Sequence, residues 1–211
     1  MINLIIDGDF TILSLTEMVK TYGRESTSRI LDSFRSIHDS STESFLRTKA
    51  IEMEMRDLSR TYLAVSEDEV MIFGYITIGI KCMRVPEENL LSRKTKKSMN
   101  IDCRTNIVQS YLIGQLSRSA DAPKGLGSYL LDIAFEKLNK TRELVGCRIV
   151  RLDCHDELIP YYRSHGFKLI TKNDDRSLNQ MIAFVDSIDT GCLILDHLML
   201  TIHSQEALLQ P

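Results

Sequence analysis

The sequence predicts an α/β or α+β domain in which a β-sheet carries helices on its faces. Three observations predict it. A β-branched and aromatic run at residues 70–83, VMIFGYITIGIKCM, is typical of a central strand. From residue 107 onward the pattern changes from strand to loop, helix, strand, helix and strand. Within that order, residues 126–139 repeat apolar side chains at helical spacing, which indicates a helix packed on the sheet.

Length and charge suit such a domain. The chain has 211 residues, 43% of them apolar, and a net charge of −3. We divide it into a helical N-terminal segment at 1–60, which is part of the same domain, a core at 61–185 and a tail of unknown role at 186–211. A nearly neutral chain argues against a surface built throughout for nucleic acid but leaves room for a local basic patch.

The cysteines and the N-terminal sequence indicate the cellular compartment that we expect for the protein. There are five cysteines and no CxxC pair, so the spacing offers no zinc site and the odd count does not suit a disulfide framework. The start, MINLIIDGDF, lacks the basic residues of a signal peptide, and no stretch approaches the ~20 apolar residues of a membrane span. We therefore expect a cytoplasmic protein with reduced thiols, no metal and no membrane association.

The sequence of the N-terminal half predicts two helices and a β-hairpin. Apolar residues recur at helical spacing at about 42–58 and less regularly at about 26–37. The polar turn SEDE separates the run TYLAV at 61–65 from the run at 70–83, so we expect the two runs to pair. The polar segment 86–106 is either a solvated excursion with a short helix or a contact for phosphates and acidic partners. Its cations are Arg93, Lys94, Lys96 and Lys97.

The C-terminal half alternates strands with helices. We expect strands at 107–117, 147–154, from 167 and at 179–185, and helices at 126–139 and 156–165. In the second helix Pro160 is tolerated near the first turn. Gly166 ends that helix, since glycine readily adopts the left-handed conformation of a helix cap. The apolar run CLILDHLML at 192–200 is left without an assigned role.

Two glycines open the helix of 126–139. Gly125 and Gly127 have no Cβ, so a ligand can approach the main chain. The first turn of a helix has unpaired N–H groups and the positive end of the helix dipole, and Lys124 adds a charge beside it. These features indicate an anion site. The order fits neither a P-loop nor the GxGxxG dinucleotide motif, because Leu130 stands where the third glycine would be.

Two segments together resemble the GNAT N-acetyltransferases. That family carries [QR]xxGx[GA] at the mouth of a long helix, and residues 122–127 here read APKGLG. Its later helix commonly ends in a phrase like FYxxxGF, and residues 161–167 here read YYRSHGF. The resemblance spans roughly 61–185. It implies a mixed, mostly antiparallel central sheet flanked by helices, with a helical N-terminal extension.

One residue departs from the family pattern. Ala122 stands where the family prefers Gln or Arg, a side chain that usually helps to shape the pyrophosphate loop. Backbone donors can still do the main work, and Arg118 or Lys124 can compensate. The affinity for the coenzyme is the property that this difference affects.

The resemblance implies acetyl-CoA as the acetyl donor and locates its site. In the family, the strands before and after the phosphate loop splay apart and the pantetheine arm enters between them. The residues that this implies for coenzyme binding are Leu116, Ser117, Arg118, Lys124, Gly125, Leu126, Gly127 and Ser128. For Leu116, Ser117 and Arg118, ordinary sheet structure is the alternative.

Tyr162 lies where family members place the acid that protonates the leaving thiolate. A phenol with a pKa near ~10 is protonated at neutral pH. The alternative for Tyr162 is ordinary core packing with its hydroxyl satisfied. Tyr161 is the neighbour that we expect to pack.

A general base is harder to find. Many relatives carry a glutamate on the strand before the phosphate loop, whereas QSYLIGQLS at 109–117 has no carboxylate. We hypothesise that the acceptor is an amine of low pKa, or that water carries the proton away. Asp153 and His155 are either polar contacts for the substrate or helix caps.

The function implied is transfer of an acetyl group from acetyl-CoA to a primary amine, on a small molecule or a protein. The segments KGLGSYLL and YYRSHGF are also arranged as in toxin-type family members that acetylate the amino acid on charged tRNA, which would bind through the cluster at 93–97. Without turnover, the same scaffold would be a module that binds coenzyme A or a protein partner. The sequence does not give the oligomeric state and leaves a homodimer open.

Overall fold

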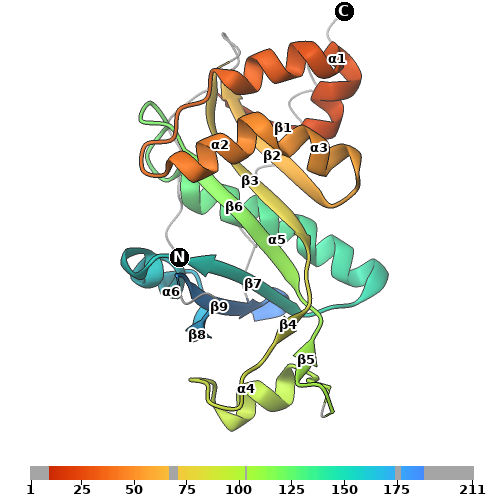
Figure 1. Cartoon of the computed structure of the whole chain (residues 1–211), viewed down its shortest axis with the longest axis vertical. Helices are drawn as coiled ribbons and strands as arrows, with labels where there is room; N and C mark the ends of the chain where they lie inside the picture. The colour runs from red at the N-terminus through yellow and green to blue at the C-terminus, as the bar shows by residue number, and fades with distance from the viewer. Residues whose placement is uncertain (1–9, 67–70, 103, 174–176, 188–211) are drawn as a thin grey trace, which may run out of the picture.

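A seven-stranded sheet runs through the computed structural model, which describes residues 10–66, 71–102, 104–173 and 177–187. The strand order is β1-β2-β3-β6-β7-β9-β8 (Figure 1). Neighbouring strands are antiparallel except β6 and β7, which are parallel. The mixed, mostly antiparallel sheet that the family resemblance implied is therefore confirmed.

The elements have the following bounds. The strands of the sheet are β1 Phe10–Ser14, β2 Ser59–Ser66, β3 Ile72–Ile80, β6 Tyr111–Arg118, β7 Ile149–Cys154, β8 Lys168–Lys172 and β9 Asn179–Phe184. The helices are α1 Leu15–Asp32, α2 Ser40–Thr48, α3 Ala50–Met55, α4 Arg93–Ser98, α5 Leu126–Val145 and α6 Ile159–Ser164. A separate two-stranded ribbon consists of β4 Met83–Arg84 and β5 Ile107–Val108.

Several of these bounds differ from those that the sequence predicted. The helix expected at 42–58 is two helices, because Lys49 leaves the helical conformation between α2 and α3. Helix α1 begins far earlier than the helix expected at 26–37 and has a kink at Gly23, whose φ is 77°. The strand expected at 107–117 is divided into β5 and β6. β1 was not expected at all, since it lies in a segment read as helical.

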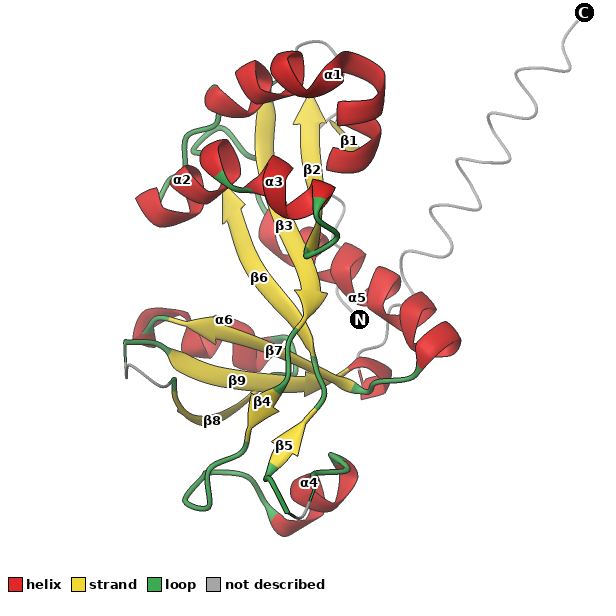
Figure 2. Ribbon diagram, turned by 45° about the vertical axis from the view of Figure 1, so that its right-hand side comes forward, coloured by secondary structure: helices red, strands yellow, loops and turns green. Residues whose placement is uncertain are grey.

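Helices cover both faces of the sheet (Figure 2). Helix α5 packs on one face through a core that also contains residues of β3, β6 and β7. Helices α1, α2 and α3 pack on the opposite face through a second core, at the end of the sheet formed by β1, β2 and β3. A third core joins β7, β8 and β9 to β4, β5 and the segment around α4. The segment expected to be a solvated excursion at 86–106 is thus partly packed, since Leu91 and Met99 are buried there.

The parallel strands β6 and β7 separate soon after they meet. Only two residue pairs join them, Tyr111 with Val150 and Leu112 with Arg151. Beyond these pairs β6 continues to Arg118 and β7 to Cys154 without pairing to each other, and Figure 1 shows them diverging. We call these unpaired stretches, Ile113–Arg118 and Leu152–Cys154, the β6–β7 fork.

A β-bulge shapes β6 within the fork. Its register with β3 passes from Thr77–Gln115 to Ile78–Ile113, so Gly114 is an extra residue without a partner. As a result Ile113 and Leu116 both pack towards α5, although they are three residues apart. Ser117 faces the other side of the sheet, where it contacts α2.

No helix in the described ranges is long and apolar enough to cross a membrane. The apolar run at 192–200 lies outside the described residues.

Candidate functional site

The first turn of α5 has main-chain donors that the protein leaves unpaired. Gly125 precedes the helix with φ 92° and ψ −8°, and no side chain caps the helix. The N–H of Leu126 donates to the carbonyl of Pro123 at 3.2 Å, and Tyr129 begins the regular helical bonding to Gly125 at 3.1 Å. The N–H groups of residues 124, 125, 127 and 128 donate to no acceptor among the described residues. With the exposed Lys124 beside them, these four donors form a site for an anion.

Leu126 holds this helix start in place. Its side chain is fully buried in the core beneath α5. It lies against Gly74 of β3, where an added Cβ would be 3.1 Å from the leucine and 2.7 Å from the carbonyl oxygen of Ser117. Since the N–H of Leu126 is also taken by Pro123, this residue anchors the donors rather than adding one.

The missing side chain at Gly127 leaves space for another part of the protein, in addition to the unpaired N–H of this residue. A Cβ added there would lie 3.1 Å from the hydroxyl of Tyr161. That hydroxyl is buried and lies near the hydroxyl of Ser128 without a hydrogen bond of good geometry, and burial raises the pKa of Tyr161. The missing side chain therefore accommodates the packing of Tyr161 from α6.

Tyr162 lies in the core between α5 and the sheet, close to the end of β7. It is 7% exposed and makes edge-on contacts with Tyr161 and Phe167, at ring-centre distances of 5.1 and 5.7 Å. Burial raises the pKa of its phenol far above the ordinary value, and Cys154 nearby acts in the same direction. Burial likewise raises the pKa of the Cys154 thiol to about 11. At neutral pH Tyr162 therefore keeps its proton.

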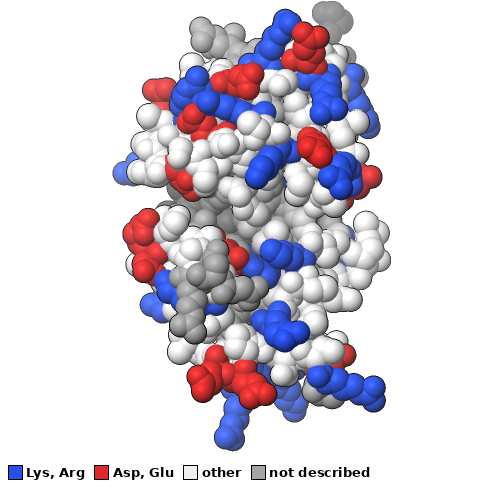
Figure 3. Space-filling view, in the orientation of Figure 1, with Lys and Arg blue, Asp and Glu red and all other residues white. Residues whose placement is uncertain are grey.

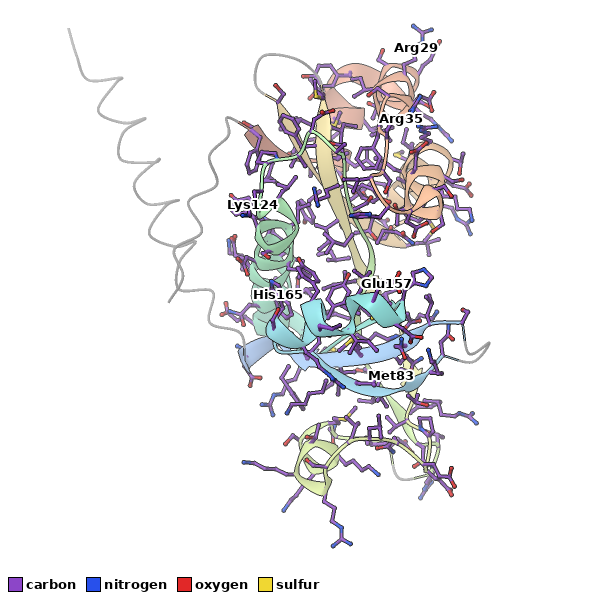
Figure 4. The ribbon with its side chains drawn as sticks, turned by 90° about the vertical axis from the view of Figure 1, so that its left-hand side faces the viewer. Arg29, Arg35, Met83, Lys124, Glu157 and His165 are labelled. Atoms are coloured by element: carbon purple, nitrogen blue, oxygen red, sulfur yellow. The ribbon has the colours of Figure 1, made fainter. Side chains whose placement is uncertain are left out.

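A histidine that the sequence analysis did not single out joins α5 to α6. His165 Nε2 lies 2.9 Å from the hydroxyl of Ser128, and its Nδ1 lies 2.8 Å from the carbonyl oxygen of Tyr161. Because the carbonyl can only accept, Nδ1 carries a proton, and in neutral His165 the hydroxyl of Ser128 donates to Nε2. Figure 4 shows His165 on the turn after α6 and Lys124 at the start of α5.

Two of the residues expected on β6, Ser117 and Arg118, are tied to α2 and to the segment between α1 and α2. The hydroxyl of Ser117 lies 2.9 Å from those of both Thr42 and Ser36. The carbonyl of Arg118 accepts a bond of 3.0 Å from the N–H of Ile37. Leu116 packs against the core beneath α5. The fork edge of β6 faces no strand in the described chain.

Asp153 and His155 have different environments. Both oxygens of Asp153 accept hydrogen bonds from Nη2 of Arg151, at 3.0 and 2.9 Å. Asp153 is therefore half of an ion pair on β7 and not a helix cap. His155 precedes the 3₁₀ turn Asp156–Leu158 but its side chain makes no capping bond. Capping, which the sequence left open for both residues, is therefore wrong.

The four cations of the 93–97 cluster all lie on α4, at the opposite end of the molecule from α1 (Figure 1). Among the described ion pairs none involves Arg93, Lys94, Lys96 or Lys97. Figure 3 shows Lys and Arg interspersed with Asp and Glu over the face that it presents. The cluster is thus a local feature and not part of a continuous basic surface in that view.

No protein-family model matches the sequence, and no curated protein matches it. Solved structures do match in fold. A mutant of KacT superposes with a TM-score of 0.68 and 17% identity, over 86% of this chain and 98% of that one. AtaT complexed with acetyl-methionyl-tRNAfMet gives 0.64 and 18%, over 81% and 94% of the two chains. AtaTR bound with AcCoA gives 0.60 and 18%, over 86% and 96%. The chain therefore shares the fold of these structures, and the GNAT-like fold class that the sequence predicted is confirmed.

Proposed function

We propose that this protein transfers an acetyl group from acetyl-CoA to a primary amine. The observation that carries the proposal is the set of four unpaired N–H groups at the start of α5, next to the β6–β7 fork. The similarity in fold to AtaTR bound with AcCoA supports it.

The donors at residues 124, 125, 127 and 128 bind the diphosphate of the coenzyme, and Lys124 adds its charge. Leu116, Ser117 and Arg118 offer main-chain groups on the free edge of β6 to the pantetheine arm. Since the hydroxyl of Ser117 already bonds to Thr42 and Ser36, the main chain and not this side chain serves the ligand.

Tyr162 supplies the proton for the departing thiolate after a neutral amine attacks the thioester carbonyl. Its raised pKa suits this role, because the phenol remains protonated until a strong base forms beside it. The only ionised partner that Asp153 has in the described chain is Arg151, and β6 carries no carboxylate. The acceptor amine therefore has a low pKa or loses its proton to water.

Calorimetry with acetyl-CoA, followed by mass spectrometry of a panel of amines, tests the proposal. The protein should bind acetyl-CoA and acetylate at least one amine. Tyr162→Phe should lower kcat about 10²-fold or more while the KM for acetyl-CoA stays the same. Tyr161→Phe is the matched control, since its hydroxyl makes no hydrogen bond of good geometry and its loss should leave kcat unchanged. Binding without transfer to any amine would instead favour a non-catalytic module.

A second candidate is acetylation of the amino acid on charged tRNA. The similarity to AtaT complexed with acetyl-methionyl-tRNAfMet favours it, and the unpaired cations of α4 could contact phosphates. Binding of charged tRNA should then weaken with salt, and weaken further when Lys94 and Lys97 are changed to Gln. Lys140→Gln is a control, because Lys140 already pairs with Glu136 at 2.5 Å. Absence of tRNA binding at low salt would exclude this candidate.

A further inference from the structure

The sheet face opposite α5 is apolar at both ends and polar in the middle. At one end α1, α2 and α3 bury the core around Leu63 and Tyr75, and at the other end β4, β5 and α4 bury the core around Ile149 and Ile182. Between the two cores lie Arg151 and Asp153 of β7 and Gln180 of β9, which is the register partner of Asp153. Figure 3, which views this face, shows a recess between the upper and lower parts of the molecule.

Arg151 belongs to this face because its neighbours in β7 belong to the other. Val150, Leu152 and Cys154 all pack in the core beneath α5. Side chains alternate along a strand, so Arg151 and Asp153 point away from α5. The register partner of Arg151 is Ile182, which lies in the core on the opposite face.

The guanidinium of Arg151 is buried and largely unpaired. Its side chain is 5% exposed. One nitrogen, Nη2, contacts both oxygens of Asp153, whereas Nε is buried without any partner. Nη1 also makes no hydrogen bond to the residues that the structure describes. An end-on pair of this kind leaves a charged donor group in need of an oxygen acceptor, because unpaired buried donors are costly.

The unpaired donors of Arg151 lie next to the β6–β7 fork. Arg151 is the last residue of β7 that pairs with β6, so it stands where the two strands begin to separate. The donors of α5 and the ring of Tyr162 lie on the other face of the sheet. A thioester that reaches through the fork from the α5 side would therefore meet an acceptor arriving from the Arg151 side.

We propose that Arg151, oriented by Asp153, binds the acceptor through a carbonyl or anionic oxygen next to the reacting amine. The inference rests on the proposed acetyl transfer and adds the chemical class of the acceptor. An α-amine beside a carbonyl has such an oxygen within reach, and an isolated alkylamine does not. A site built to bond a polar group of its substrate discriminates strongly against an analogue that lacks it.

Leucinamide and isopentylamine test the proposal, because they differ only by the carboxamide. The α-amine of leucinamide has a pKa of ~8 and an alkylamine one of ~10.4, so the rates are compared per neutral amine. On that basis the wild-type protein should acetylate leucinamide with a kcat/KM about 10- to 100-fold higher, as expected for a hydrogen bond to a charged donor. Arg151→Gln should abolish this preference by raising the KM for leucinamide, with the KM for acetyl-CoA and the rate on isopentylamine unchanged. Arg148→Gln is the control, since Arg148 pairs with Asp186 at 2.6 Å at the start of the same strand.

A preference that survives in Arg151→Gln would overturn the proposal, and so would an equal loss of activity on both amines. If Arg151→Gln does not fold, as judged by its melting temperature, Arg151→Lys and Asp153→Asn replace it. Each should raise the KM for leucinamide alone, and an unchanged KM in both would again overturn the proposal.

The acceptor site can also be tested without turnover. Calorimetry of leucinamide with the protein saturated with coenzyme A should show binding in the wild type and none in Arg151→Gln. If neither amine is acetylated but this difference is seen, acetyl transfer fails and the Arg151 site stands. If both amines are acetylated equally, the proposed transfer stands and the Arg151 site fails.

Discussion

Helices α2 and α5 begin in opposite ways. At α2, the carboxylate of Asp39 accepts a hydrogen bond of 2.7 Å from the N–H of Ser41. Ser14 caps α1 and Ser92 caps α4 in the same manner. The start of α5 has a glycine in place of a cap, although the helix itself is firmly anchored in the core. Helices α3 and α6 also lack a side-chain cap, but each directly follows another helical segment. Among α1, α2, α4 and α5, which do not, only α5 is left open, and its start is the one that we assign to a ligand.

The largest effect expected from this contrast is at Gly125. A β-branched residue is strained at φ 92°, so Gly125→Val should turn the four N–H groups out of alignment. We expect acetyl-CoA to bind about 100-fold more weakly, which corresponds to the loss of two charge-assisted hydrogen bonds. Gly146→Val is the control, since Gly146 also has a positive φ, 78°, but lies at the other end of α5. Calorimetry should show a loss only for Gly125→Val, and an equal loss in both would contradict the assignment.

A double substitution separates packing from ligand binding at the same helix start. Gly127→Ala should lower the free energy of unfolding by about 1–3 kcal/mol, because the new methyl group crowds the hydroxyl of Tyr161. Tyr161→Phe removes that hydroxyl, which makes no hydrogen bond of good geometry, so on its own it should be neutral or stabilising. The pair should be more stable than Gly127→Ala alone in denaturant unfolding. Strictly additive effects would show that Tyr161 is not what Gly127 accommodates.

At α2 the expected effect is on stability alone. Asp39→Ala should cost about 1 kcal/mol of unfolding free energy through loss of the cap, with acetyl-CoA affinity unchanged. Burial raises the pKa of Asp39, but the hydrogen bonds from Ser41 outweigh it and leave the pKa below its usual value. The cap therefore stabilises the protein fully above the unfolded pKa of ~3.9 and loses its effect as the pH falls through the lower folded value. Urea unfolding of both proteins at pH 7 and at pH 3 should show the difference shrink, and a constant difference would argue against an ionised cap.

The smallest effect is expected at Lys124. Its side chain is exposed, so Lys124→Gln should weaken acetyl-CoA binding by only a few-fold, in line with about 0.2–1 kcal/mol for an exposed ion pair. The loss should diminish at high salt, because salt screens exposed charges. A loss as large as that of Gly125→Val would mean that charge, and not the main-chain donors, dominates the site.

Local patterns predicted the parts of the fold in which the chain contacts its near neighbours. The hairpin of β2 and β3, and the start of α5 at Leu126, were predicted from strand composition and apolar spacing. β1 was missed because FTILS is a short edge strand, and its pairing with β2 joins residues about fifty positions apart. Helix α1 was misplaced because Gly23 interrupts it and the run RESTS at 24–28 is polar, which separates the apolar residues Leu15, Met18 and Val19 from those near its end.

The parts of the candidate site that lie in short sequence motifs were predicted, and the contacts between residues distant in the sequence were not. The glycines of the α5 start and the tyrosine of α6 form short motifs, which can be recognised within a few residues of sequence. His165 bonds to Ser128 across 37 positions, and no spacing rule joins them. Arg151 did leave a signal, since a charged residue stands inside the apolar strand CRIVRLDC. An arginine buried in that way needs a partner, and the alternation of β7 could have assigned Asp153 to the same face.

The bulge at Gly114 determines which side chains of β6 face each side of the sheet. Because side chains alternate with a period of two, removing this one residue would exchange inside and outside for every position on one side of it. Leu116 would then face the hydroxyl groups of Thr42 and Ser36, and Ser117 would face the hydrophobic core beneath α5. A deletion of one glycine would in that way reverse the orientation of several residues of β6 at once, whereas substitutions nearby would each disturb a single contact.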